Sequence, residues 1–142
     1  MRNLATEGKS KRAALGPGLI VAPLLFDRKS VEQGIPANAA RELDPLGLTR
    51  DDIRMIIPDR TLDRRIADGA TLKIEEADGI ARLLRVVGMA RRVFESDALA
   101  DEWLRAPNPA LDGHTPIRMA RTDLGGREVE AVLGRIEHGV FG

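Results

Sequence analysis

The chain has no cysteine and no tyrosine, and only 3% of its 142 residues are aromatic. Without cysteine it can form no disulfide, no thiolate nucleophile and no cysteine-ligated zinc site. Its apolar residues are mainly Leu, Ile, Val and Ala, a composition that suits packed helices better than a β-sandwich. The sequence therefore predicts an all-α fold.

The sequence also lacks an excess of charge of one sign, and it lacks a segment that could span a membrane. The formal net charge is +0, so any binding to nucleic acid must come from the local placement of basic residues. The apolar run LIVAPLLF at 19–26 contains Pro23 and is far too short to cross a bilayer. It also has no cleavage pattern typical of a signal peptide. We expect a cytoplasmic protein without a membrane partner.

Motifs for catalysis or metal binding are lacking as well. There is neither a glycine-rich phosphate loop followed by Lys nor a His-Glu-x-x-His helix. His114 and His138 are far apart in the sequence, so we expect no metal site and no cofactor. Glu137 beside His138 is a weak candidate for proton transfer, because helix neighbours do not face each other. We predict no enzymatic activity; an enzyme fragment of unknown type is the remaining alternative.

Residues 1–29 are predicted to be a flexible tail and leader, since the first part of this segment is polar and basic and ends at Gly16-Pro17. The alternative is a basic arm that touches DNA phosphates through Lys9, Lys11 and Arg12.

Residues 30–72 contain several short helical stretches separated by Gly and Pro. Pro36 suits the first turn of a helix that reaches Leu43. Thr49 is a predicted N-cap, with Asp52 as its capping-box partner, for a helix that Pro58 stops. A second helix follows at once, with Asp59 as its expected cap, and closes at Gly69. Two short helices joined by a tight turn predict a helix-turn-helix.

The second of these helices has an apolar face and a mostly basic face. Leu62 and Ile66 are four residues apart and are expected to face inward. The candidate DNA contacts lie on the opposite face and are Arg60, Thr61, Arg64 and Arg65. The alternative is that this face is simply exposed to solvent.

The strongest helical pattern runs over 73–94, and this helix is expected to pack against both halves of the chain. Gly79 and Gly88 in it suggest close approach of another helix. Ser96 is the expected cap of the next helix, which carries Leu99 and Trp103 four residues apart. Thr115-Pro116 begins a short helix, and the last helix is predicted over about 126–138.

The stretch PNPALDG at 107–113 interrupts this helical pattern. Its two prolines fix backbone angles, and Asn108 can stabilise a turn. The loop is therefore a rigid corner, a pre-organised surface for a partner, or both. Trp103 is either a core residue or a binding hot spot. Val140 and Phe141 either dock on the chain's own helices or meet a partner.

The C-terminal half resembles a known family. Its Trp-Leu pair, Pro-Asn-Pro-Ala-Leu-x-Gly loop, Pro-led short helix and final EVEAVLGRIEHGV helix resemble the Xre/MbcA/ParS-like toxin-binding domain of Xre-type antitoxins from RES–Xre toxin–antitoxin modules. This resemblance covers about 75–142. The upstream LTRDDIRMIIPDRTLDRRIADGATLKIEEADGI resembles the Xre-like helix-turn-helix of the same antitoxins, although Asp59 and Asp63 depart from its more basic pattern.

The resemblance implies a helix-turn-helix module at 30–72 followed by a helical toxin-binding module at 73–142. It implies an antitoxin that neutralises a RES-domain, NAD-degrading toxin by blocking its active site, binds operator DNA to repress its own operon, and forms a homodimer that assembles further with toxin. The candidate toxin-binding residues are Trp103, Pro107, Asn108, Pro109, Leu111, Arg135, Glu137, Val140, Phe141 and Gly142.

Within this assignment we expect the terminal GVFG to reach the entrance of the toxin's active site. There the carboxylate of Gly142 would meet cationic groups. The alternative function is a stand-alone helix-turn-helix transcription regulator whose C-terminal module only dimerises.

Overall fold

The computed structural model describes residues 26–139, and every regular element within them is helical, which confirms the all-α prediction. In chain order these elements are α2 (Arg28–Gln33), η2 (Ala37–Arg41), η3 (Asp44–Leu46), α3 (Arg50–Arg54), α4 (Asp59–Ala67), α5 (Ile74–Phe94), α6 (Asp97–Leu104), η4 (Pro109–Leu111), α7 (Pro116–Met119) and α8 (Asp123–Glu137), where η marks a 3-10 helix.

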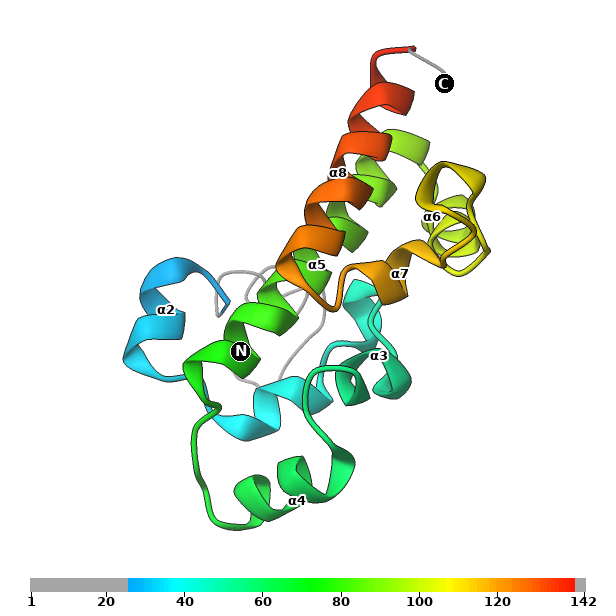
Figure 1. Cartoon of the computed structure of the whole chain (residues 1–142). Helices are drawn as coiled ribbons and strands as arrows, with labels where there is room; N and C mark the ends of the chain where they lie inside the picture. Colours follow the sequence, from blue (N-terminus) through cyan, green and yellow to red (C-terminus); the bar gives the residue numbers. More distant parts are fainter. Residues whose placement is uncertain (1–25, 140–142) are drawn as a thin grey trace, which may run out of the picture.

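Helix α5 is the central element of the fold. Figure 1 shows α8 running beside it, α6 near its C-terminal end and α2 near its N-terminal end. Its fully buried Leu83 and Val86 belong to one continuous core, which also includes Leu62 of α4 and Leu133 of α8. Both halves of the chain therefore share a core built on α5, as the sequence predicted.

Several local signals produce the expected helix starts. The Thr49 N–H donates to Asp52 Oδ2 at 2.8 Å, and the Asp52 N–H donates to Thr49 Oγ1 at 3.2 Å, which completes the predicted capping box. Ser96 Oγ accepts from the Leu99 N–H at 3.1 Å and caps α6. Pro116 occupies the first turn of α7. These caps fix where α3, α6 and α7 begin.

Two predicted features in the first half were wrong in detail. The helix expected from Pro36 to Leu43 is only the 3-10 helix η2. Asp59 does not cap α4: Pro58 holds the cap position, and the Asp59 carboxylate accepts instead from Arg54 Nε at 2.9 Å. The carboxylate therefore joins α4 to α3 rather than capping its own helix.

The last helix begins at Asp123, three residues before the predicted start. Thr122 caps it by accepting from the Gly125 N–H at 3.0 Å. Gly125 and Gly126 are both buried inside the first turns of this helix. A Cβ on Gly125 would lie 1.9 Å from the Met119 carbonyl oxygen, so α8 needs glycine there to pack against the end of α7.

The packed part of the chain begins before residue 30. The Phe26 side chain is 5% exposed, and Asp27 caps α2 by accepting from the Ser30 N–H at 2.8 Å. Both residues lie in the segment 1–29 that was predicted to be a flexible tail and leader, so that prediction is wrong for them. The remaining leader residues, 1–25, lie outside the described part of the chain.

The two glycines of α5 differ in their surroundings. A Cβ on Gly79 would lie 3.0 Å from Ile56 Cγ2, so there is a close contact there, but with a side chain of the turn between α3 and α4 and not with another helix. At Gly88 a Cβ would meet nothing within 4 Å. Over 26–139, no helix combines the length and the apolar character that a bilayer span requires.

Candidate functional site

The loop between α6 and α7 is closed by its own backbone. The Asn108 N–H donates to the His114 carbonyl at 3.1 Å, and the Gly113 N–H donates to the Asn108 carbonyl at 2.8 Å. Asn108 Oδ1 also accepts from the Ala110 N–H at 2.9 Å. Asp112 and Gly113 both adopt the left-handed conformation that closes such a turn. The loop thus has a defined shape before any partner arrives.

The predicted contact residues of this loop divide between surface and core. Pro107 and Pro109 are exposed, and Asn108 is partly exposed. Leu111 is only 2% exposed and packs the loop onto the core. The structure therefore corrects its assignment: in this conformation the Leu111 side chain anchors the loop and is not available for direct contact with a partner.

Arg105 anchors the start of the loop to the first half of the chain. Its Nη1 and Nη2 donate to Asp52 Oδ1 at 3.0 Å and Oδ2 at 2.7 Å, and Nη2 also donates to the Gly47 carbonyl at 3.1 Å. The Asp101 carboxylate accepts from Nε at 2.7 Å. The hydrogen bond to Asp52, more than any other contact, raises the pKa of the Arg105 guanidinium above its usual range. Sequence spacing gave no sign of this anchor.

A partly apolar surface lies beside the loop on α6. Trp103 is half-buried, and its ring packs on Phe94 with centroids 5.7 Å apart and an angle of 42° between the planes. Leu99, one turn earlier, is 53% exposed. The two alternatives for Trp103 are therefore compatible, because one part of the side chain supports the core while another is accessible.

A cationic pocket of about 320 Å³ lies on the other side of the loop. Gly113, Thr115, Met119 and Thr122 contribute to its walls, together with three basic side chains that the sequence analysis did not select, His114, Arg118 and Arg121. Among residues 26–139, neither Arg118 nor Arg121 has an ion-pair partner for its side chain. This pocket can receive acidic groups of a partner.

The buried Arg82 holds the wall of that pocket in place. Its side chain donates to the Ala120 carbonyl from Nε at 2.7 Å and to the Arg121 carbonyl from Nη2 at 2.8 Å. Arg82 is 9% exposed, and a Cβ on Gly126 would lie 2.9 Å from its Cδ. The arginine of α5 thus fixes the turn between α7 and α8.

Helix α8 ends in the region that the sequence assigned to toxin binding. Arg135 and Glu137 are both exposed, and Glu137 Oε2 lies 3.5 Å from Arg92 Nε of α5. The described chain ends at Gly139, which adopts φ +74°. The predicted contacts Val140, Phe141 and Gly142 lie outside the described residues.

The candidate DNA-binding residues of α4 also divide into two groups. Arg60 and Arg64 are exposed and have no ion-pair partner among residues 26–139, and Thr61 is half-buried. Arg65 forms an ion pair with Glu76 of α5, and both side chains are less than 15% exposed. The structure therefore corrects Arg65 from a DNA contact to a residue that joins α4 to α5.

The two acidic residues of α4 that depart from the basic pattern are neutralised by neighbouring arginines. Asp63 pairs with Arg41, and Asp59 pairs with Arg54 at 2.8 Å and with Arg50 at 3.5 Å. The hydrogen bond from Arg54 lowers the pKa of the Asp59 carboxyl below its usual range. Because both carboxylates are paired with other arginines, they do not neutralise Arg60 and Arg64 on the exposed face of α4.

Groups of three or more His, Cys, Asp or Glu side chains able to hold a metal ion do not occur within 26–139. The candidate site consists of the braced loop, the partly apolar patch on α6, the cationic pocket and the end of α8. These surfaces are suited to contact with a macromolecule.

Comparison with known proteins agrees with this arrangement. Residues 89–139 match the family described as the antitoxin Xre/MbcA/ParS C-terminal toxin-binding domain. The chain is 36% identical to an Antitoxin Xre of Pseudomonas putida over 92 residues, which cover 65% of this chain and 58% of that relative. It is 37% identical to an Antitoxin Xre of Yersinia enterocolitica over 86 residues, or 60% and 58% of the two chains.

A more distant relative is the "Prs ADP-ribosylating antitoxin" of a Sphingobium species, 29% identical over 90 residues that cover 57% of each chain. The chain spans a little under three fifths of the length of these curated relatives. The matched segment 89–139 includes the braced loop, the cationic pocket and α8. The resemblance to Xre-type antitoxins is therefore confirmed, and within residues 89–139 the chain is similar to the C-terminal toxin-binding domain of Xre/MbcA/ParS antitoxins.

Proposed function

We propose that this chain is the antitoxin of a type II toxin–antitoxin system, and that it neutralises a RES-domain, NAD-degrading toxin by covering the toxin's active site. The observation that carries the proposal is the family match over 89–139, the segment that contains the braced loop and α8. The antitoxin names of the relatives from Pseudomonas putida and Yersinia enterocolitica support it.

The chemistry of the surface suits inhibition by occupancy. Leu99 and Trp103 offer apolar area next to the exposed Pro107 and Pro109. The loop is closed by its own hydrogen bonds, so little conformational entropy is lost when it docks. The uncompensated cations Arg118 and Arg121 favour acidic residues of the partner and speed its approach. The proposal requires no chemistry from the antitoxin itself.

The C-terminal residues complete this proposal. In the sequence, the predicted contacts Val140, Phe141 and Gly142 come directly after Gly139, the residue that follows the last turn of α8. We infer that these residues enter the toxin's active-site entrance. Deleting residues 139–142 then weakens binding and neutralisation; full neutralisation by the shortened chain rules this role out.

Co-purification tests the antitoxin proposal as a whole. The full chain is produced with a tagged RES-domain protein encoded beside it, and a stable complex is expected together with restored growth of the toxin-producing cells. Size-exclusion chromatography with light scattering measures the stoichiometry and tests the homodimer and the larger assembly that the family resemblance implies. Recovery of the tagged RES-domain protein without the chain contradicts the proposal.

We further propose that α4 binds operator DNA and represses the operon. Two uncompensated arginines on one exposed helix face, Arg60 and Arg64, support this function. Figure 1 shows α4 at one end of the molecule and the end of α8 at the other, so the two partners have separate surfaces. The alternative, a stand-alone regulator whose C-terminal module only dimerises, predicts operator binding without any toxin complex.

A further inference from the structure

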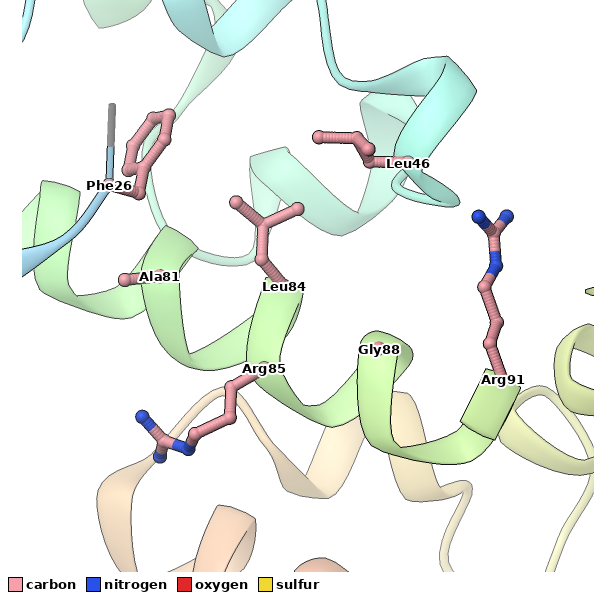
Figure 2. A pocket seen from close by; sticks show the side chains of 7 residues that line it. All are labelled: Phe26, Leu46, Ala81, Leu84, Arg85, Gly88 and Arg91. Carbon is pink, nitrogen blue, oxygen red and sulfur yellow. The ribbon is translucent and has the colours of Figure 1, made fainter. Parts of the chain in front are cut away.

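An apolar groove of about 400 Å³ runs along α5 on the face turned toward Phe26 and η3. Figure 2 shows Leu84 pointing between Phe26 and Leu46, with Gly88 forming an open part of the floor. At Gly88 a Cβ would meet no atom within 4 Å. Because a void of about 150 Å³ already accepts a benzene-sized group, this groove has room for more than one aliphatic side chain.

Charged groups are confined to the rim of the groove. Arg85 points away from it and donates to Glu130 of α8 at 2.8 Å. Arg91 closes the far end and is engaged by Asp97 at 3.4 Å and by the Pro45 carbonyl at 3.4 Å. With both arginines satisfied elsewhere, the groove favours an uncharged, aliphatic occupant.

The sequence supplies such an occupant at the position where the described chain begins. Residues 19–25 read LIVAPLL and form, together with Phe26, the longest uninterrupted apolar run in the chain. They lead directly into Phe26, which is itself a wall of the groove. We propose that residues 19–25 of the same chain occupy the groove along α5.

The lengths are compatible with this assignment. The floor from Ala81 to Arg91 spans ten helical steps, or about 15 Å. Seven extended residues reach about 23 Å, so the run 19–25 can cover the floor from its attachment at Phe26. Pro23 is acceptable there because an extended segment in an apolar groove needs no helical hydrogen bonds. The proposal replaces the sequence-based expectation that this segment belongs to a flexible leader.

Because the chain has no cysteine, single introduced thiols can report on the groove. In the full chain, Gly88→Cys is expected to react several-fold more slowly with a maleimide than the same variant carrying Leu24→Ser and Leu25→Ser. Gly134→Cys on α8, which also has open space around its Cβ, is the control and should react equally in both backgrounds. Equal reactivity of Gly88→Cys in both backgrounds overturns the proposal.

Disulfide formation identifies the occupant. A chain with Val21→Cys and Gly88→Cys is expected to form an internal disulfide under mild oxidation, whereas Val21→Cys with Glu32→Cys serves as the control. Glu32 is exposed on α2, only six residues from Phe26. A segment 19–25 that is not docked would therefore reach position 32 as readily as it reaches the groove. Ala81→Cys replaces Gly88→Cys if the latter is poorly folded.

Equal cross-linking to Glu32→Cys and to the groove contradicts docking. Disulfides that join two chains, in a mixture of tagged and untagged protein, show that a second copy fills the groove, and they also overturn the proposal. Neither result depends on toxin binding, so this inference and the proposed function are tested separately.

Discussion

The Arg105 guanidinium donates two hydrogen bonds, of 3.0 Å and 2.7 Å, to the Asp52 carboxylate, although the two residues are 53 positions apart in the sequence. Asp52 lies in α3, and Arg105 ends α6 two residues before Pro107. The Asp52 side chain is 4% exposed. This pair joins the half of the chain that we propose to bind DNA to the loop that we propose to bind the toxin.

Loss of this pair should destabilise the protein. Asp52→Ala removes both the capping box of α3 and the partner of Arg105, and we expect the free energy of unfolding to fall by about 3 kcal/mol. Asp101→Ala removes only the exposed partner of Arg105 and should cost less than about 1 kcal/mol. Urea unfolding measures both values. Equal losses in the two variants would show that Asp52 has no special role.

Two glycines of α8 should respond in opposite directions to alanine. Gly125→Ala places a Cβ against the Met119 carbonyl oxygen, and we expect a loss of about 3 kcal/mol in unfolding free energy. Gly134→Ala meets open space in the same helix and should add about 0.5–1 kcal/mol. Thermal unfolding of both variants provides the check. A tolerated alanine at 125 is incompatible with the packing described for α7 and α8.

The Asp59 carboxyl should titrate below the usual aspartate pKa of 3.8, chiefly because Arg54 donates to it. The carboxylate's contribution to stability is therefore present above the usual pKa and disappears as the pH falls through the lowered value. NMR titration of the side-chain carboxyl measures the pKa directly. Arg54→Ala should raise this pKa, whereas Arg60→Ala should leave it unchanged; an unmoved pKa in the Arg54 variant refutes the assigned cause.

Leu99→Glu should weaken toxin binding at least about tenfold, because it places a charge in the apolar patch beside Trp103. Ile74→Glu is the matched control, since Ile74 is 57% exposed but lies outside the matched segment 89–139. Titration calorimetry with the toxin measures the affinities, and the melting temperatures of both variants should stay close to that of the parent. Similar affinities for the two variants argue against a role for the patch.

Alanine at Arg64 should weaken binding to the DNA upstream of the gene by roughly 1–3 kcal/mol if this residue reads a base. Arg127→Ala is the control, because Arg127 is exposed on α8 and paired with Asp123. Fluorescence anisotropy at several salt concentrations separates a base contact from a phosphate contact, since loss of the latter reduces the salt dependence. If the Arg64 variant binds this DNA with the affinity of the parent chain, Arg64 does not contact DNA.

Local chemistry made much of the fold predictable. Thr49 and Ser96 are good N-caps that act within four residues, so the starts of their helices could be placed from sequence. The apolar repeat of α5 likewise predicted its length to within a residue. The start of α8 was predicted three residues late, because a glycine at a helix end and a glycine that allows close packing, as Gly125 does, have the same sequence signal.

Long-range contacts were not predictable from the sequence. Nothing in the spacing of Arg105 or Arg82 marks it as an anchor, because each partner lies on an element far along the chain. Arg65 was predicted to lie with Arg64 on the basic face of α4, yet of these two residues only Arg65 forms an ion pair with Glu76 of α5. The burial of Leu111 similarly depends on how the loop folds back onto the core.

The rate of NAD breakdown by a RES-domain toxin of the kind we propose as partner, measured while the purified full chain is added, tests the central claim most directly. The account predicts that turnover falls in proportion to the added chain and stops when the binding sites on the toxin are filled. A stable complex that still degrades NAD at the rate of the free toxin would contradict it.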